Sequence, residues 1–377
     1  MGNNRRDFVR RGGAIAAAAL VGGGLAGCGG APSGESQNQA GSSDRTFNWR
    51  MVMAWPTDFP GLGTGAARFA ERIEQMSNGR IRIRIFGAGE LVPAYEVFDA
   101  VSRGTVELGH SAAYYWRSRL PEAQWFGAVP FGMNVHELNA WLYHGGGLDL
   151  WQETYRPHGI VPFPAGNTGV QMGGFFKQKI RGLNDFRGLR MRIPGLGGEV
   201  FRRIGGSPAN LPGGELFTAL QTGAIDAVEW VGPYNDLAFG LHRAANYYYY
   251  PGWQEPSASL EALVNADAWA ELPPDLKAIV RTAAEATNQD MLCEYMARNP
   301  ASLKRLIEQH GIEVHRFPDE VLDALYQAST EVVKDLAGHS ELSARIHESY
   351  MAFKTLLAPY MAISEEAYSK ERERQRS

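Results

Sequence analysis

The sequence has only two cysteines in 377 residues, Cys28 and Cys293, and they lie far apart. This number and spacing exclude a disulfide framework and a cysteine-based metal site. An excess of positive charge is also missing, because 37 basic and 41 acidic residues give a net charge of −4 without a basic stripe. Nucleic acid is therefore not an expected partner. The length and a hydrophobic content of 44% allow two domains with cores of ordinary size.

Motifs that carry catalytic chemistry are largely missing as well. His136-Glu137 is not followed by a histidine at the zincin spacing, and the chain contains neither a G-x-S-x-G elbow nor a Walker lysine. The glycine-rich segments at 87–90 and 195–199 lack the full dinucleotide fingerprint. A binding protein is therefore expected, and an exported metal-dependent enzyme acting on carboxylates is the alternative from another class.

The first 28 residues are interpreted as an export signal. Segment 5–9 (RRDFV) resembles a twin-arginine motif, and the apolar run at 14–21 is too short for a membrane span. Segment 25–28 (LAGC) resembles a lipobox with Cys28 as the lipidated residue, and the alternative is an ordinary signal peptide with an incidental cysteine. Residues 29–45 are predicted to form a flexible tether. We therefore expect a periplasmic protein that reaches a membrane only through its lipid.

Hydrophobic periodicity predicts alternating strands and helices after this leader. Phe47–Ala54 and Arg80–Ile85 are predicted strands, while Gly63–Ser77 and Pro93–Ser102 are predicted helices. A further strand is expected at Val106–His110. Strands that alternate with helices are typical of parallel sheets, so the sequence predicts an α/β fold.

A faint internal repeat indicates that one α/β lobe is built twice. Ala100–His110 and Ala219–Glu229 each contain a helix end, a glycine, and a short strand with an acid three positions after that glycine. Upstream, the strand and glycine turn at Arg84 match those at Arg192. Because ligands bind at the carboxyl ends of parallel strands, we expect the residues after each strand to meet in a cleft between the lobes.

The C-terminal part is helical in pattern. Cys293 is predicted to be a buried thiol in one of these helices, with a reactive role as the alternative. The last helix is long and highly charged at its end, which is typical either of a solvated surface helix or of a dimer-forming arm. The predicted helices are Asp275–Asn288, Gln289–His310, Pro318–Ala337 and Ser340–Glu371.

Polar residues at predicted strand ends and turns indicate a carboxylate site beside a cation site. Arg192 ends a strand and can clamp a carboxylate with two hydrogen bonds, although a surface position like that of Arg190 is the alternative. Glu229 follows an apolar strand, so it needs a cation or an arginine as its partner. Together with Glu255, the Gln171 amide and a backbone carbonyl, it could hold a hard cation.

At this point the chain resembles the DctP-type receptors of tripartite ATP-independent periplasmic (TRAP) transporters, in particular their α-keto acid and lactate-binding branch. The resemblance covers roughly residues 46 to 370, and segment 220–234 is its most specific part. The motifs that carry it are 86–93 (FGAGELVP), 109–116 (GHSAAYYW), 129–133 (VPFGM), 165–174 (AGNTGVQMGG), 191–199 (MRIPGLGGE) and 220–234 (LQTGAIDAVEWVGPY).

The resemblance implies the two-lobed periplasmic binding protein fold, with crossing hinge strands, a long helix that spans both lobes, and a C-terminal helical extension. Lobe I is expected at 46–164 plus about 253–288, and lobe II at 165–252 plus about 289–339. The C-terminal helix is expected at 340–377.

The resemblance also implies the site and its partners. The expected ligand is a small monocarboxylate, either a 2-oxo acid such as pyruvate or lactate, and the alternatives are a sugar acid or an aromatic acid. The expected partners are the membrane subunits of a TRAP transporter and a second copy of the chain, bound through the C-terminal helix. Substrate-contacting positions are Arg192, Asn167, Tyr115, Gln171 and Trp230, while Gln171, Glu229, the Trp230 carbonyl and Glu255 hold a sodium or calcium ion.

Overall fold

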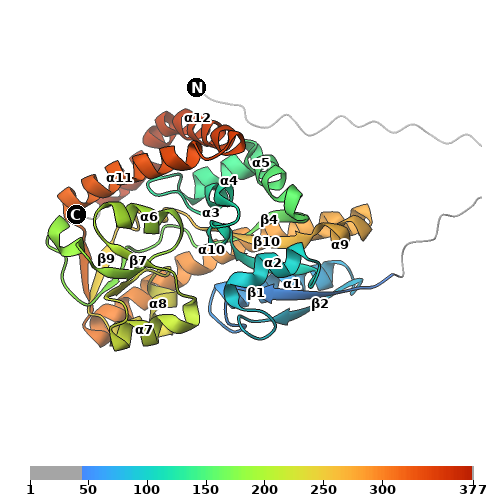
Figure 1. Cartoon of the computed structure of the whole chain (residues 1–377), viewed down its shortest axis with the longest axis horizontal. Coiled ribbons are helices and arrows are strands. Elements are labelled where there is room, and N and C mark those ends of the chain that lie inside the picture. Colours follow the sequence, from blue (N-terminus) through green and yellow to red (C-terminus); the bar gives the residue numbers. More distant parts are fainter. Residues whose placement is uncertain (1–44, 376–377) are drawn as a thin grey trace, which may run out of the picture. The chain divides into compact units, whose positions relative to one another are not determined.

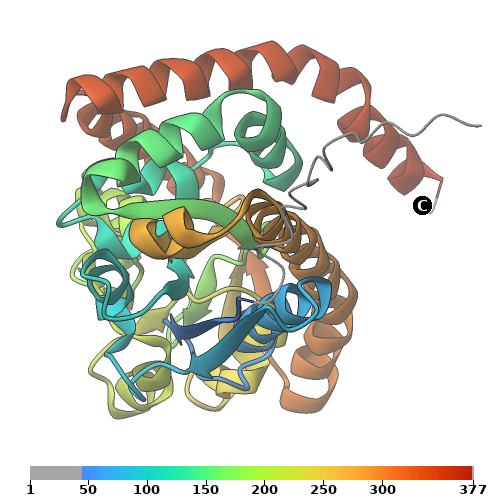
Figure 2. The ribbon, with the colours of Figure 1, turned by 90° about the vertical axis from the view of Figure 1, so that its right-hand side faces the viewer.

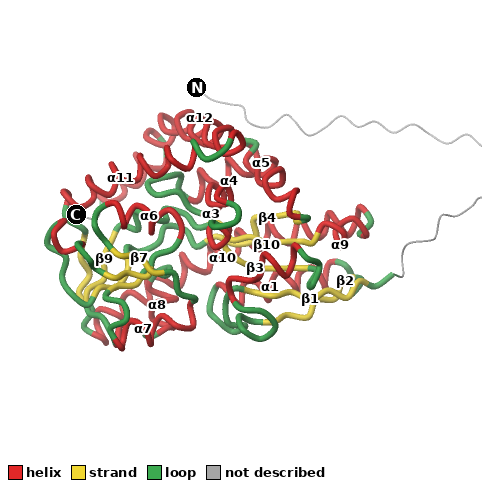
Figure 3. Tube along the Cα trace, viewed as in Figure 1, coloured by secondary structure: helices red, strands yellow, loops and turns green. Residues whose placement is uncertain are grey.

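The computed structural model describes residues 45–375, which fold into two lobes that are each built on one β-sheet (Figures 1 and 3). The signal, tether and lipidation predictions for residues 1–44, including Cys28, lie outside the described residues. The sheet of lobe I has the order β2-β1-β3-β10-β4. Its strands are β1 (Phe47–Met53), β2 (Ile81–Phe86), β3 (Leu108–Ala112), β4 (Ile160–Asn167) and β10 (Ser259–Asn265).

The sheet of lobe II has the order β11-β9-β5-β8-β6-β7. In both sheets the strands joined by helices pair in parallel, as predicted, but β10 and β5 run antiparallel to their neighbours. These two strands arrive directly from the other lobe, so the helical crossover that makes a parallel pair is absent. The strands are β5 (Gly174–Phe176), β6 (Arg190–Arg192), β7 (Ser207–Ala209), β8 (Ala227–Val228), β9 (Tyr247–Tyr250) and β11 (Glu313–Arg316).

Amphipathic helices cover the sheets. In α1 (Leu62–Met76), Phe69 and Ile73 are buried while Glu71 is exposed, which is the helical spacing that the sequence showed. The other helices of lobe I are α2 (Val97–Ser102), α3 (Gln124–Gly127), α4 (Val135–His144), α5 (Gly147–Tyr155) and α9 (Ala266–Glu271). Those of lobe II are α6 (Gly195–Arg203), α7 (Leu216–Thr222) and α8 (Pro233–Phe239).

The internal repeat is present, but its first half was aligned incorrectly. After Gly104 and Gly223, which both have a positive φ, an acid binds the preceding parallel strand in the same way in each lobe. The Glu107 carboxylate accepts hydrogen bonds from the Arg50 backbone and guanidinium, and Asp226 does so from Arg190. The unit β1-α1-β2-α2-β3 therefore corresponds to β6-α6-β7-α7-β8.

The true counterpart of β2 is thus β7 and not β6. The prediction paired the strand of Arg84 with that of Arg192 because both precede a glycine turn, whereas each sheet places β1 and β6 at the equivalent central position. Similar turns follow several strands of an α/β lobe, so a turn alone does not identify the strand.

Two segments cross between the lobes and lie beside each other. Residues 168–173 lead from β4 to β5, and residues 251–258 lead from β9 to β10. Backbone N–H groups of Thr168 and Gln171 donate to the carbonyls of Ala258 and Glu255, at 3.2 and 3.1 Å. These paired segments are the crossing hinge strands of the predicted fold.

A single helix, α10 (Pro274–His310), replaces the two helices predicted at 275–288 and 289–310. The sequence has no glycine or proline at the proposed break, and Pro300 lies inside the helix without ending it. The helix contacts β4 and α1 of lobe I and α8 of lobe II, so it spans both lobes. Cys293 lies on its exposed face, and the prediction of a buried thiol was therefore wrong.

The C-terminal extension contains α11 (Asp319–Ala337), α12 (Glu341–Ile363) and α13 (Glu365–Arg374). The single helix predicted from Ser340 to Glu371 is interrupted at Ser364, whose ψ of −98° is not helical. Figure 2 shows α12 lying across the helices at 135–155, with α13 continuing beyond them. Among residues 45–375 no helix has the length and apolar character needed to cross a membrane.

Candidate functional site between the two lobes

Arg192 is the central cation of the candidate site. It ends β6, its side chain is only 1% exposed, and its Nη1 donates to the Glu229 carbonyl at 2.7 Å. Burial opposes its charge, but the neighbouring Tyr115 and Glu229 raise the pKa of Arg192 above its ordinary value. A surface position is therefore excluded for Arg192, in contrast to Arg190, which is exposed and paired with Asp226.

The Nη2 edge of the Arg192 guanidinium has the weakest contacts with the protein. Nε donates to the Leu211 carbonyl at 3.2 Å, and Nη1 also lies 3.3 Å from Glu229 Oε2. Nη2 makes a long contact of 3.5 Å with the Tyr115 hydroxyl, and the Tyr95 side chain also interacts with the guanidinium. The Trp230 ring lies 4.8 Å from the guanidinium carbon. A guanidinium held in this way is oriented by the protein and keeps donors for a carboxylate.

Glu229 and Glu255 are two buried acids near this one arginine. Glu229 directly follows β8, and Glu255 lies in the crossing segment 251–258. Burial and the neighbouring Glu255 raise the pKa of the Glu229 carboxyl far above its ordinary value. Burial raises the pKa of Glu255 to about 8, against hydrogen bonds from Tyr114 and Gln171. Two acids with raised pKa values indicate that positive charge is in short supply at this site.

Gln171 places an amide beside the second acid. It lies in the other crossing segment, its backbone N–H donates to the Glu255 carbonyl, and its side-chain Nε2 donates to Thr168 Oγ1 at 3.2 Å. Its Oε1 is buried and has no hydrogen-bond partner among the described residues, and the same holds for Glu229 Oε1. Buried oxygen atoms without partners are costly, so these two are candidates for binding an additional group.

These residues fit a hard cation. Glu229, Glu255 and Gln171 supply carboxylate and amide oxygens, and Trp230 adds a backbone carbonyl next to Glu229, which are the ligand types of calcium and sodium sites. Within residues 45–375 no group of three His, Cys, Asp or Glu side chains could hold a metal. The donor set therefore depends on the amide and the carbonyl as well as on two acids.

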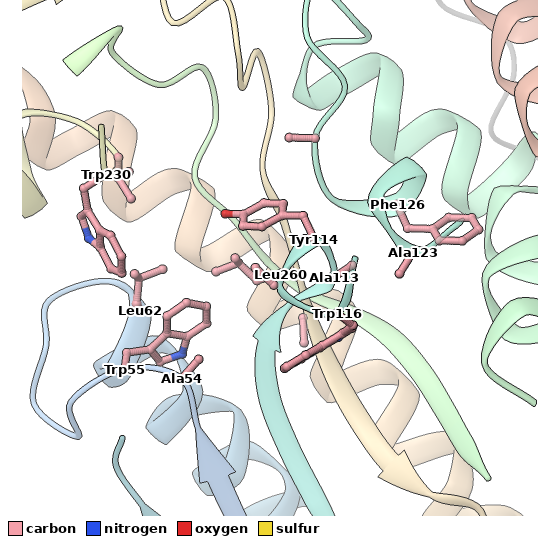
Figure 4. Close-up of a cluster of buried hydrophobic side chains, with 14 of the residues drawn as sticks. Ala54, Trp55, Leu62, Ala113, Tyr114, Trp116, Ala123, Phe126, Trp230 and Leu260 are labelled. Atoms are coloured by element: carbon pink, nitrogen blue, oxygen red, sulfur yellow. The ribbon is translucent and has the colours of Figure 1, made fainter. Parts of the chain in front are cut away.

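Aromatic residues of lobe I complete the site. Tyr114 and Tyr115 lie in the short 3₁₀ turn η2 (Ala113–Trp116) after β3. The Tyr114 hydroxyl donates to Glu255 Oε2 at 3.4 Å, and Figure 4 shows it directed toward the side on which Trp230 and Trp55 lie. Because Arg192 and Trp230 come from lobe II, the site is made by both lobes, as the cleft argument predicted.

Asn167 is a predicted site residue whose side-chain oxygen and nitrogen both hydrogen-bond to the crossing segments. It ends β4 and is fully buried. Its Oδ1 accepts from the Gly169 N–H at 2.9 Å, and its Nδ2 donates to Ser257 Oγ at 3.1 Å. Among the hydrogen bonds of the described chain, none joins Asn167 to Arg192 or Glu229. The structure thus brings Arg192, Glu229, Glu255, Gln171, Trp230 and Tyr115 together, and it places Asn167 at the end of β4, where the crossing segment that carries Gln171 begins.

Two contributors were missed by the sequence argument. Tyr95, in the turn η1 (Ala94–Glu96), packs against Tyr115 in a tilted arrangement with ring centroids 4.7 Å apart, and its hydroxyl donates to Asn210 Oδ1 of lobe II at 3.2 Å. The rule for strand ends could have found it, since it follows the loop after β2. Asp236 is buried in α8 and accepts a hydrogen bond from Tyr248, while burial raises its pKa to about 7. No sequence signal marked it.

Comparison with known proteins assigns this architecture. The model of the bacterial extracellular solute-binding protein, family 7 (DctP), matches residues 51–339. The monocarboxylate 2-oxoacid-binding periplasmic protein of Nostoc sp. strain PCC 7120 is 44% identical over 322 residues, which are 85% of this chain and 87% of that protein. The predicted resemblance to DctP receptors is thereby confirmed, as is the prediction of a receptor rather than an enzyme.

Two solved structures have the same fold. A TRAP transporter solute-binding protein from Bordetella bronchiseptica, a mixed-occupancy dimer with copurified calcium and picolinate, has a TM-score of 0.85 and 38% identity, over 87% of this chain and 98% of its own. One from Pseudoalteromonas atlantica with bound sodium and pyruvate has a TM-score of 0.84 and 40% identity, over 86% and 99%. The predicted two-lobed fold is thus confirmed, and this chain belongs to the DctP family of bacterial extracellular solute-binding proteins.

Proposed function

We propose that this receptor binds a small 2-oxo acid such as pyruvate, or lactate, together with a sodium or calcium ion, and delivers the acid to the membrane subunits of a TRAP transporter. The observation that carries the proposal is the buried Arg192 guanidinium beside unpartnered oxygens of Glu229 and Gln171. The 2-oxoacid-binding relative and the pyruvate-bound structure support this ligand class.

The proposed roles follow from the contacts. Arg192 holds one edge of the carboxylate, since the contact of its Nη2 with the Tyr115 hydroxyl is long. A bound cation supplies positive charge to the carboxylate and to the adjacent 2-oxo or 2-hydroxy oxygen. Glu229, Glu255, Gln171 and the Trp230 carbonyl hold that cation, and Gln171 and Trp230 also contact the acid. Asn167 is the further proposed substrate contact, at the hinge.

Aromatic side chains set the proposed size limit. Tyr115 and Trp230 face Arg192 from the two lobes, and Trp55 and Phe59 pack against them at centroid distances of 6.5 and 6.3 Å. We expect these rings to exclude water from the bound acid and to limit its length. A ligand held by both lobes stabilises their contact and shifts the equilibrium between open and closed receptor.

The decisive experiment is isothermal titration with pyruvate. Arg192→Lys keeps a positive charge beside Glu229 but loses the planar fork, so we expect affinity about a hundred-fold weaker. The matched control is Arg190→Lys, two positions away in the same strand and exposed, which should bind like the parent. An Arg192→Lys protein that melts normally and binds pyruvate unchanged would refute the clamp.

A second candidate ligand is an aromatic acid. The Bordetella bronchiseptica relative copurified with picolinate, a carboxylate beside a ring nitrogen that presents two adjacent donors as a 2-oxo acid does. A thermal-shift screen with pyruvate, lactate, picolinate and a sugar acid separates these ligands. The largest shift with picolinate would replace pyruvate as the leading ligand, whereas the largest shift with a sugar acid would contradict both.

The proposed location is the periplasm, reached through twin-arginine export, with Cys28 as a lipid anchor. A Cys28→Ser variant should move from the membrane fraction to the soluble periplasmic fraction. Equal fractionation of both forms contradicts the anchor but leaves the receptor function untouched. We also propose the lobe boundaries as 46–164 plus about 253–288 for lobe I and 165–252 plus about 289–339 for lobe II.

A homodimer is proposed through the C-terminal helices at 340–377. The first half of α12 packs on lobe I, where the buried Tyr350 hydroxyl accepts a hydrogen bond from the Met133 N–H at 2.7 Å. Its second half and α13 expose four large apolar side chains, and a second copy is the proposed partner because the Bordetella bronchiseptica relative is a dimer. The exposed side chains are Leu356, Tyr360, Ile363 and Tyr368.

A further inference from the structure

A cavity of about 510 Å³ lies on lobe II between α8, the turn η7 (Leu241–Arg243) and the last part of α10. Figure 1 shows α8 beside α10, and none of the residues that line the cavity belongs to the carboxylate site. Its lining includes two arginines and two histidines but no carboxylate. The polar lining residues are Tyr234, His242, Arg243, Ser302, Arg305 and His310.

The positive groups of this cavity lack counter-charges. Arg243 lies over the Phe217 ring at 4.4 Å, and neither it nor Arg305 forms an ion pair with any residue in 45–375. By contrast, Arg190 and Arg203 of lobe II form ion pairs with Asp226 and with Glu331 and Asp335. Lys304, next to Arg305 but outside the cavity lining, lies 3.9 Å from Glu308.

Two histidines add to the basic character of the cavity lining. The rings of His242 and His310 lie 4.1 Å apart, and His242 Nδ1 is buried without a hydrogen-bond partner in the described chain. Burial, followed by repulsion from His310, Arg243 and Arg305, lowers the pKa of His242. The groups that face His242 are therefore uniformly basic, and an anion among them would relieve their mutual repulsion.

We propose that this cavity binds a phosphate group, either as free phosphate or as the headgroup of an anionic phospholipid. Two guanidinium groups and two imidazoles match a tetrahedral dianion with several acceptor oxygens better than a monocarboxylate with one charge. The volume exceeds that of a single phosphate, so an organic group attached to the phosphate also fits.

Two binding assays on the full chain carrying Cys28→Ser, which removes the proposed lipid, distinguish the two sources. The first is calorimetric titration with inorganic phosphate, with sodium chloride at equal ionic strength as the reference. The second is co-flotation with phosphatidylglycerol vesicles, with phosphatidylcholine vesicles as the reference. Arg305→Gln and Arg243→Gln should weaken binding at least ten-fold, whereas Lys304→Gln, which removes an equal charge one residue away, should not.

Each outcome decides the proposal. Binding of phosphate alone identifies free phosphate, and binding of phosphatidylglycerol vesicles alone identifies a headgroup. Phosphate should also raise the midpoint of the His242 side-chain titration followed by NMR, which an attraction to the general surface does not do. The proposal would be overturned if neither phosphate nor phosphatidylglycerol vesicles bound. It would also be overturned if Lys304→Gln and Arg305→Gln lost affinity equally. Both arginines are exposed, so melting temperatures are expected to stay unchanged and serve as the folding check.

Discussion

Among the individual residues, the acids of the site have different surroundings from the acids of the surface. Glu107 and Asp226 bind arginines and have lowered pKa values, because hydrogen bonds from Arg50 and Arg190 favour their charged forms. Glu229 and Glu255 are buried with Arg192 as their shared cation, and their pKa values are raised. The charge balance at the site therefore favours the binding of an added cation.

Glu229→Gln is expected to weaken pyruvate binding at least about ten-fold, because one charged hydrogen-bonding group is lost from the proposed cation site. It should also reduce the dependence of affinity on added sodium or calcium. Calorimetry in ion-depleted and ion-supplemented buffer measures both effects. Asp226→Asn is the control and should keep the ion dependence, since Asp226 of the same lobe pairs with the exposed Arg190 and not with Arg192. Full ion dependence in Glu229→Gln would argue against the proposed ligand set.

Glu261 is a buried acid of β10 that contacts neither Arg192 nor the proposed cation ligands. Trp116 Nε1 and Tyr155 donate to its carboxyl, the latter at 2.8 Å, and burial raises its pKa from 4.5 to about 8. The folded protein therefore keeps this proton while the unfolded chain loses it above pH 4.5. By linkage, the free energy of unfolding falls as the pH rises through this window.

Glu261→Gln should flatten that pH dependence. Between pH 4.5 and 8 the parent is expected to lose up to about 4 kcal/mol of its free energy of unfolding through this group, and the variant should lose correspondingly less. Urea unfolding at pH 5 and pH 8 measures the difference. His110, whose pKa burial lowers to about 4, acts in the opposite direction below pH 6.5 and is present in both proteins. Parallel curves for parent and variant would contradict the argument.

Whether the location of a single residue can be predicted from the sequence depends on the element in which it lies. Arg192 and Glu229 were predicted because a strand end fixes where a side chain goes. Cys293 was misplaced because its apolar character says nothing about which face of α10 it occupies. Tyr95 was missed because only residues directly after each strand were considered, whereas Tyr95 lies in η1, beyond the loop that follows β2.

Among the elements, the two crossing segments approach each other unusually closely. A Cβ atom added at Gly252 would lie 2.1 Å from the Gln171 carbonyl oxygen, so the pairing of residues 168–173 with 251–258 requires glycine there. This contact also holds Gln171 in place relative to Glu255.

Gly252→Ala is expected to lower the free energy of unfolding by about 1–3 kcal/mol and to weaken pyruvate binding, because the backbones must move apart. Chemical denaturation and calorimetry measure the two effects. Gly214→Ala serves as the control, since nothing lies within 4 Å of an added Cβ at that position. A stable Gly252→Ala protein with normal affinity would show that the hinge tolerates separation.

The regular elements were the easiest to predict. The alternating strand at 80–85 and the helix at 63–77 came within a few residues of β2 and α1, because their periodicity follows one buried face. Sheet direction was only partly predicted, since β5 and β10 enter from the other lobe. The continuity of α10 depends on its packing against both lobes, which no local pattern records.

In the whole molecule, among residues 45–375, the C-terminal extension carries the large apolar side chains with the highest exposed fractions. Leu356 is 74% and Ile363 is 77% exposed, and with Tyr360 they lie at helical spacing on one face of α12. The first half of α12 is already packed on lobe I without a second copy of the chain. Substitutions in the exposed second half should therefore affect association and not folding.

Replacing Leu356, Tyr360 and Ile363 by serine should convert a dimer into a monomer with unchanged pyruvate affinity. Size-exclusion chromatography with light scattering measures the mass of each form. Met296→Ser, which removes one exposed apolar side chain from α10, is the control and should leave the mass unchanged. A parent protein that is monomeric at all concentrations tested would contradict the proposed dimer.

The crossing segments carry one more consequence. Gln171 and Glu255 lie on the two chain segments that connect the lobes, so an ion that they share would link those connections to each other. Ion occupancy and lobe orientation then become one coupled equilibrium. The salt composition around the receptor would thus set how far it stands open before any acid arrives.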